Sequence, residues 1–201
     1  QYMRAEYGIS SKDFVFIYSG RIDIYKGVLE LVKAFKKINR EDTKLLVVGK
    51  SWFGDKNVKD EYTCKVQKEA EKVRDKIIFT GFVNPEQMPL MYQIADCLVV
   101  PSIWEEPFGV VALEGMASGL PLIVTNSGGL PEIVNDKCAV IVNKEKDIVN
   151  NLTDEMNKMI INEEKTKKMG EYARETVQSV PAYDSKNYFR FFLEKIINEW
   201  D

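Results

Sequence analysis

The stretch "CLVVPSIWEEPFGVVALEGMASGLPLIVT", residues 97–125, contains a complete strand–helix–strand unit. Its two ends, residues 97–102 and 121–125, are almost continuously apolar, which is typical of strands buried on both faces of a parallel sheet. The segment between them has the length of a helix, and Pro107 suits the first helical position. This unit predicts an α/β fold.

The same alternation of strand and helix continues on both sides of the unit. The short apolar runs that we expect to be strands are residues 14–19, 44–49, 76–81, 97–102, 121–125 and 138–142. Apolar residues at helical spacing lie between them, at Val28, Leu31, Val32, Phe35 and Ile38 and again at Met88, Met91, Ile94 and Ala95. Asn84 is expected to cap the second of these helices, with Pro85 at its first position. The six alternations predict a Rossmann-like, doubly wound parallel sheet of about six strands.

Length and composition are those of one soluble domain. The 201 residues can form one substantial core, and 45% of them are apolar and 29% charged. The net charge of −3 argues against a nucleic-acid-binding surface. No apolar run approaches the roughly 20 residues of a membrane span. Because the chain begins at Gln1 and shows no signal peptide, we expect a cytoplasmic fragment of a longer protein.

The chain has no histidine and only three cysteines, Cys64, Cys97 and Cys138. Without histidine or a C-x-x-C pair, a typical zinc site is not expected, and no metal ligand is predicted. A Ser-His or Cys-His catalytic pair is also excluded. We expect the cysteines to be buried thiols in a reducing compartment.

Glycines follow most of the predicted strands; they are Gly20, Gly49, Gly81, Gly128 and Gly129. Ligands of open α/β sheets bind beyond the carboxyl ends of the strands, where glycine either admits a ligand or simply forms a turn. Arg21 and Lys26 lie at the same edge, and two such cations beside a helix N-terminus suit a diphosphate, although ordinary surface cations give the same pattern. No G-x-x-x-x-G-K-[ST] or G-x-G-x-x-G follows the first strand, which argues against Walker-type ATPases and ordinary dinucleotide sites.

Two glutamates, Glu106 and Glu114, flank the apolar segment of the central unit. In a helix from Pro107, Glu114 would be surrounded by apolar residues, so we expect a buried carboxylate that meets either structural donors or a ligand. Glu106 falls in the N-cap region, where its charge suits the helix dipole although Glu is not a preferred cap. Eight helical residues span about 12 Å. Two diol-binding carboxylates on either side of an anion site suggest a nucleotide-sugar.

The last third of the chain, from Lys144, is expected to be helical and charged. Its final segment, residues 183–201, has an apolar face formed by Phe189, Phe192, Leu193, Ile196, Ile197 and Trp200. This helix either packs on its own domain or presents that face to a second domain that the fragment lacks.

Five segments resemble, in order, those of the retaining glycosyltransferases of family 4. They are "SGRIDIYKG", "FTGFV", "IADCLVVPS", the run from Glu106 to Glu114 with "PFGVVALE", and "NSGGLPEIV". The resemblance covers residues 14–142 strongly and the helical remainder loosely. It implies a GT-B fold of two Rossmann-like domains, of which residues 1–201 are the C-terminal, donor-binding one.

The resemblance also implies a role for individual residues. Arg21, Lys26 and Glu106 would be catalytic: the two cations contact the donor diphosphate, and Glu106 accepts hydrogen bonds from the sugar. Glu114 would bind the ribose diol. The remaining donor-binding residues would be Gly20 at the close approach of the backbone, Phe82 and Val83 toward the base, Phe108, Gly109 and Val110 through backbone amides, and Gly128 and Gly129 as the pocket floor. Glu105 is not part of this pattern and is expected to be solvated or to cap a loop.

The function predicted from these observations is metal-independent, retaining hexosyl transfer from a nucleotide-sugar, with UDP-hexose or UDP-N-acetylhexosamine preferred, to a hydroxyl of a polysaccharide or glycolipid. No cofactor is expected. The acceptor would be bound by a missing N-terminal domain, and the whole protein could associate peripherally with the inner face of the membrane. Two alternatives remain: a nucleotide-sugar-binding module without turnover, or a GT-B relative such as a sucrose or glycogen synthase type enzyme or a sugar-nucleotide epimerase. An epimerase would be expected to bring histidines to its site, and this chain has none.

Overall fold

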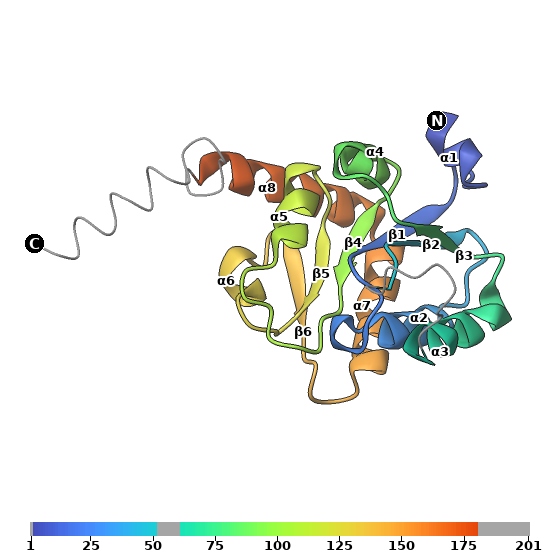
Figure 1. Cartoon of the computed structure of the whole chain (residues 1–201). Coiled ribbons are helices and arrows are strands. Elements are labelled where there is room, and N and C mark those ends of the chain that lie inside the picture. The colour runs from blue at the N-terminus through green and yellow to red at the C-terminus, as the bar shows by residue number, and fades with distance from the viewer. Residues whose placement is uncertain (1, 52–60, 181–201) are drawn as a thin grey trace, which may run out of the picture.

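Six parallel strands form the central sheet of the computed structural model, which describes residues 2–51 and 61–180 (Figure 1). The strands are β1 (Phe14–Ser19), β2 (Thr43–Val48), β3 (Ile77–Gly81), β4 (Cys97–Val100), β5 (Leu122–Thr125) and β6 (Ala139–Val142). Their order in the sheet is β3-β2-β1-β4-β5-β6, the order of the doubly wound Rossmann fold. The predicted fold class is confirmed.

Alternating side chains of each central strand enter two separate cores. Along β1, Phe14, Phe16 and Tyr18 belong to one core, whereas Val15 and Ile17 belong to the other. Both faces of the strand are therefore covered, which explains why its sequence is continuously apolar rather than alternating with polar residues.

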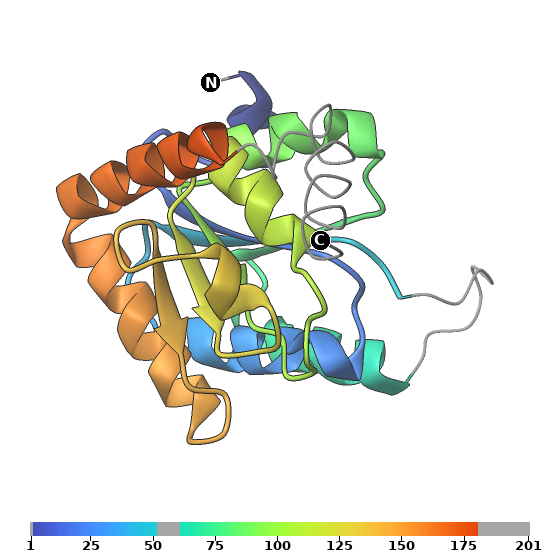
Figure 2. The same cartoon turned by 90° about the vertical axis from the view of Figure 1, so that its left-hand side faces the viewer.

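Helices cover both faces of the sheet (Figures 1 and 2). The α-helices are α1 (Tyr2–Glu6), α2 (Val28–Phe35), α3 (Glu61–Ala70), α4 (Met88–Gln93), α5 (Val110–Ala117), α6 (Leu130–Ile133), α7 (Ile148–Ile161) and α8 (Glu163–Ser179). Short 3₁₀ turns occur at η1 (Ile24–Lys26), η2 (Glu71–Val73) and η3 (Pro85–Gln87). Helix α2 packs beside α3 and α7 over one face, and α5 packs beside α8 over the other.

The strand order reverses direction between β1 and β4. From β1 the chain moves outward to β2 and β3, and it then returns through α4 to place β4 on the other side of β1. The connections after β1 and β4 consequently diverge to opposite sides at this point. Such a switch point leaves room for a ligand at the carboxyl ends of the strands.

Helix α5 begins later than the sequence pattern predicts. It starts at Val110, not at Pro107, and its N-cap Gly109 has a φ of 78°. The positive φ favours glycine, and a Cβ added to Gly109 would lie 2.5 Å from a side-chain atom of Leu130, which would have to shift. The expectation that Glu106 occupies the N-cap region, and that a continuous helix joins it to Glu114, is therefore wrong.

The expectations for the Asn84 cap, the start of α4 and the burial of the cysteines are confirmed only in part. Asn84 precedes η3 and makes no side-chain cap hydrogen bond, and α4 proper begins only at Met88. Cys97 and Cys138 are buried as expected, but Cys64 is exposed because it lies on the solvent side of α3, whose buried residues are Val66 and Ala70.

The predicted helices after Lys144 are found as α7 and α8. The proposed helix at residues 183–201 lies outside the described residues. None of the helices in the described part of the chain is long and apolar enough to span a bilayer.

Candidate functional site

Two adjoining cavities open at the carboxyl edge of the sheet, on either side of the switch point. The first has a volume of about 520 Å³ and the second of about 350 Å³. Ser19 and Gly20, at the end of β1, and Val111 of α5 line both cavities. The two cavities therefore share a wall, and a ligand longer than either could occupy both by passing over Gly20.

The first cavity lies above the ends of β1, β2 and β3. Its lining includes Gly20, Arg21, Lys50, Phe82 and Val83. The ring of Phe82 is 62% exposed, and the ammonium group of Lys50 lies 5.4 Å from the ring centroid. A flat group such as a nucleobase could stack here, because an exposed aromatic face beside a cation is a suitable stacking surface.

Glu114 lies in the wall of this first cavity. The sequence pattern predicts a buried carboxylate, but the residue is exposed. It extends from α5 toward the cavity, because the face of the helix that carries Ala112 and Met116 packs on the core and Glu114 lies outside that face. The Tyr92 hydroxyl donates a hydrogen bond to Oε2 of Glu114 at 2.7 Å. No described residue donates a hydrogen bond to the other oxygen, Oε1.

Glu106 lies in the second cavity and is the more buried of the two carboxylates. Its residue exposure is 9%. Its Oε1 accepts hydrogen bonds from the Ser102 hydroxyl, at 2.6 Å, and from the ammonium group of Lys26. Its Oε2 accepts none from the described residues and is not among their buried, unpartnered atoms, so this oxygen faces the cavity.

The backbone between Glu106 and α5 completes the second cavity. Phe108, Gly109 and Val110 line it together with Lys26. Within the described ranges, the N–H groups of Gly109 and Val110 have no hydrogen-bond acceptor. These donors lie at the start of α5, where the helix dipole also favours negative charge. The cavity thus combines an anion-binding end with one carboxylate.

The loop after β1 is held by local hydrogen bonds. The hydroxyl of Tyr18 donates to the carbonyl oxygen of Arg21 at 2.5 Å, and Asp23 caps η1 by accepting from the Tyr25 N–H. Burial raises the pKa of Tyr18 well above its ordinary value, which keeps the hydroxyl protonated as a donor. The Arg21 side chain is half exposed and lies 3.5 Å from the carboxylate of Asp23. Arg21 is also one of the residues that line the first cavity.

Gly128 and Gly129 line neither cavity, although the sequence predicts them as the floor of the site. They support the loop behind Glu106. The N–H of Gly129 donates to the Glu106 carbonyl oxygen at 2.7 Å, and a Cβ on Gly128 would lie 2.2 Å from the same oxygen. Glu105 caps this loop, because it accepts hydrogen bonds from the Gly128 N–H and the Lys144 ammonium.

The structure thus brings together ten of the twelve predicted site residues. Gly20, Arg21, Phe82, Val83 and Glu114 line the first cavity, and Gly20, Lys26, Glu106, Phe108, Gly109 and Val110 line the second. Sequence reasoning missed Ser102 and Tyr92, which hold the two carboxylates. Ser102 ends a predicted strand, a position that could have identified it, whereas Tyr92 is hidden within a helical pattern.

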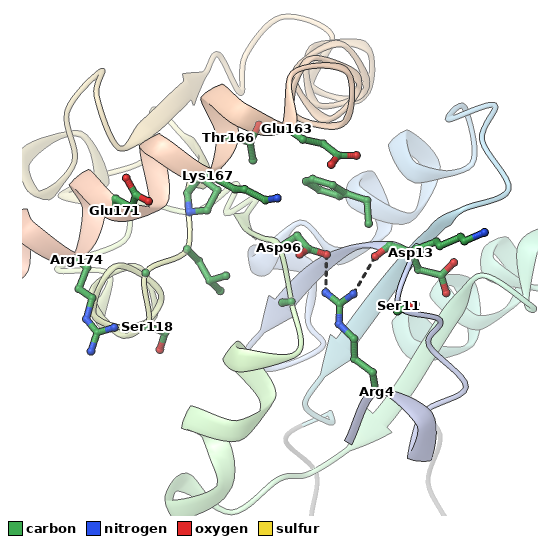
Figure 3. Close-up of a pocket in the computed structure, with 16 residues that line it drawn as sticks. Arg4, Ser11, Asp13, Asp96, Ser118, Glu163, Thr166, Lys167, Glu171 and Arg174 are labelled. Carbon is green, nitrogen blue, oxygen red and sulfur yellow. Dashed lines mark hydrogen bonds and ion pairs between the residues drawn. The ribbon is translucent and has the colours of Figure 1, made fainter. Parts of the chain in front are cut away.

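A further cavity lies at the opposite, amino-terminal edge of the sheet (Figure 3). The Arg4 guanidinium donates to the carbonyl oxygens of Ile94 and Asp13 and pairs with Asp96 at 2.7 Å. Four cations and four anions line this cavity, namely Arg4, Lys12, Lys167, Arg174, Asp13, Asp96, Glu163 and Glu171. The charges that line this cavity balance, and the Arg4 guanidinium already has the three partners named above. The role of Arg4 is to attach α1 to the segments that precede β1 and β4.

No group of three or more metal-ligating side chains occurs among residues 2–51 and 61–180.

Comparison with known proteins identifies the family. The model of the family described as "Glycosyl transferases group 1" matches residues 1–176. The lipopolysaccharide 1,2-N-acetylglucosaminetransferase of Salmonella typhimurium is 33% identical over 201 residues, which are 99% of this chain and 52% of that protein. The chain spans about half the length of this curated relative.

Solved structures show the same architecture. HepE of Anabaena in complex with UDP superimposes with a TM-score of 0.84 at 21% identity, over 98% of this chain and 52% of that one. Sucrose-phosphate synthase of Thermosynechococcus elongatus has a TM-score of 0.81 at 26% identity, over 98% of this chain and 49% of that one. These neighbours are GT-B glycosyltransferases, and the Rossmann-like sheet found here corresponds to half of each chain.

Proposed function

The chain belongs to the glycosyl transferases group 1 family, and from this premise we propose that it binds the nucleotide-sugar donor of a retaining, metal-independent hexosyltransferase. The donor is a UDP-hexose or UDP-N-acetylhexosamine. Support for UDP comes from HepE, which has been solved in complex with UDP and with UDP-glucose. Support for an N-acetylhexosamine comes from the name of the Salmonella relative.

The observation that carries the proposal is the shared wall of the two cavities, with one carboxylate on each side. The base stacks on Phe82 in the first cavity, and the ribose lies against Glu114. The sugar enters the second cavity, where the open Oε2 of Glu106 accepts hydrogen bonds from its hydroxyls. The diphosphate passes over Gly20 between them. A donor of this length uses both cavities, whereas a free nucleotide uses only the first.

The charges of the site suit departure of the nucleoside diphosphate. The bond between the anomeric carbon and the β-phosphate oxygen breaks, and negative charge develops on that oxygen. Arg21, Lys26 and the backbone N–H groups at the start of α5 stabilise this charge. Lys26 can do so while still in contact with Glu106, because an ammonium group has three donors.

Transfer with retention of configuration follows if the acceptor hydroxyl approaches from the side of the leaving group. Its oxygen forms the new bond to the anomeric carbon, and its proton passes to the departing β-phosphate oxygen. A hydroxyl of a polysaccharide or glycolipid is the proposed acceptor. The acceptor is contacted by a second, N-terminal domain of the whole protein. We place the whole protein in the cytoplasm, at the inner face of the membrane.

Calorimetric titration of this chain with UDP-, GDP- and ADP-sugars tests the proposal. We expect one nucleotide to bind and its sugar conjugate to bind more tightly. The absence of binding by every nucleotide would overturn it. Transfer by a whole protein that carries Arg21→Ala or Glu106→Ala then separates an enzyme from a binding module, because only an enzyme loses turnover.

A further inference from the structure

The two carboxylates of the site share one arrangement: in each, the protein holds one oxygen and leaves the other facing a cavity. For Glu106 the holding groups are Ser102 and Lys26, which line the second cavity themselves. For Glu114 the holding group is the hydroxyl of Tyr92, which lines neither cavity. Tyr92 therefore acts on the site only through another residue.

Tyr92 is fixed where it can hold Glu114. It lies on α4, is only 2% exposed, and packs in the core cluster that also contains Met91, Met116 and Val48. Its hydroxyl donates to Oε2 of Glu114 at 2.7 Å. Burial and the neighbouring Glu114 carboxylate raise the pKa of Tyr92, so the hydroxyl stays protonated and can only donate to that carboxylate.

A glutamate exposed on a helix would otherwise occupy several rotamers. Each rotamer points the carboxylate differently, and fixing a single one on binding costs part of the binding free energy. A donor from a rigid, buried ring removes that cost before the ligand arrives. The hydrogen bond is charge-assisted and hence stronger than one between neutral groups.

We propose that Tyr92 is a positioning residue that fixes Glu114 for recognition of ribose hydroxyls, so that the first cavity selects ribonucleotides over nucleotides that lack those hydroxyls. This inference rests on the proposed function. It assigns the discrimination to the pair, with Oε1 of Glu114 contacting the sugar and Tyr92 keeping that oxygen in place.

The test compares UDP with 2′,3′-dideoxy-UDP, by calorimetry on the whole 201-residue chain and its Tyr92→Phe variant. If the panel of nucleotides selects GDP, the corresponding pair of guanosine nucleotides replaces them. The wild type is expected to prefer UDP. In Tyr92→Phe the affinity for UDP falls about five- to tenfold, as for loss of one hydrogen bond to a charged group. The affinity for the dideoxy nucleotide stays unchanged, which also shows that the variant is folded.

Tyr7→Phe is the matched control, because the Tyr7 hydroxyl contacts the sulfur of Met91 beside Tyr92, at 3.7 Å, and lines neither cavity. It should leave both affinities unchanged. In a Glu114→Gln background the Tyr92→Phe change should have little further effect on the preference for UDP.

An equal fall in both affinities would mean that Tyr92 is merely structural. Two affinities that both stay at the wild-type values would mean that Tyr92 does not position Glu114. Either result overturns this inference while the proposed function stands, because the wild type still binds. A wild type that binds no nucleotide overturns both.

Discussion

The ammonium group of Lys26 donates to Oε1 of Glu106, which lies eighty positions further along the chain. Lys26 is in the loop after β1, whereas Glu106 follows β4, and the two loops meet because β1 and β4 are neighbours at the switch point of the sheet. Ser102 donates to the same oxygen. The pair therefore connects the two sides of the site and leaves Oε2 of Glu106 open toward the second cavity.

Removing the charge of Glu106 should affect the sugar and spare the nucleotide. In Glu106→Gln, the affinity for UDP-glucose should fall about tenfold, as for loss of a hydrogen bond to a charged acceptor, to near the affinity for UDP. Calorimetry with the two ligands measures the difference. The matched control is Glu155→Gln, because Glu155 pairs with Lys158 on α7, away from both cavities. An equal loss of affinity for UDP itself would contradict the assignment of Glu106 to the sugar.

The ion pair between Lys26 and Glu106 should also contribute to folding. In Lys26→Ala a largely buried carboxylate loses a donor, and the free energy of unfolding should fall by about 1–3 kcal/mol. Urea denaturation measures this change. The double variant Lys26→Ala, Glu106→Gln should recover much of the loss, because the amide needs no cation. The single variant Glu106→Gln completes the cycle, and an equal effect of Glu106→Gln on stability with and without Lys26 would show that the pair has no coupling.

Gly128 should tolerate no side chain. Its φ is 52°, and a Cβ would lie 2.2 Å from the Glu106 carbonyl oxygen. Gly128→Ala should therefore destabilise the chain by about 2 kcal/mol or more and weaken binding of UDP-glucose by displacing Glu106. Gly8→Ala is the matched control, since Gly8 has a φ of 65° but no atom within 4 Å of an added Cβ. It should cost only about 1 kcal/mol of backbone strain and leave binding intact. Equal effects of the two substitutions would contradict the close contact behind Glu106.

The loop cap formed by Glu105 should depend on pH. The Lys144 ammonium and the Gly128 N–H hold the pKa of Glu105 below its ordinary value. A carboxyl with a depressed pKa in the folded state stabilises the fold above its unfolded pKa, and this contribution is lost as pH falls through the folded pKa. Wild type should therefore be more stable than Glu105→Gln near neutral pH, and the difference should disappear in acid. Thermal unfolding at several pH values measures it, and a difference that grows in acid would contradict the cap.

Much of this fold follows from the sequence because strands buried on both faces have a simple pattern. The runs that became β1 and β5 are apolar up to their last residue, and no competing periodicity obscures them. The start of α5 could not be predicted in the same way. Pro107 is acceptable at a helix start, but the observed start depends on the left-handed conformation of Gly109 and on Leu130, which is distant in sequence.

The relative burial of the two glutamates also differs from the sequence prediction. A helix from Pro107 would bury Glu114 and leave Glu106 at its mouth, and the structure has the reverse. The partners of these carboxylates, Lys26 for Glu106 and Tyr92 for Glu114, come from segments that only the three-dimensional fold brings near. Residue types thus indicate the chemistry of the site, whereas tertiary contacts decide which oxygen of each carboxylate remains open.

A crystal structure of this chain with bound UDP-glucose would locate the donor in the two cavities directly. We expect the nucleotide in the first cavity, with a ribose hydroxyl within hydrogen-bond distance of Oε1 of Glu114. We expect the glucose in the second cavity, with a hydroxyl on Oε2 of Glu106. A donor bound with its glucose away from Glu106, or at the charged cavity near Arg4, would contradict this placement.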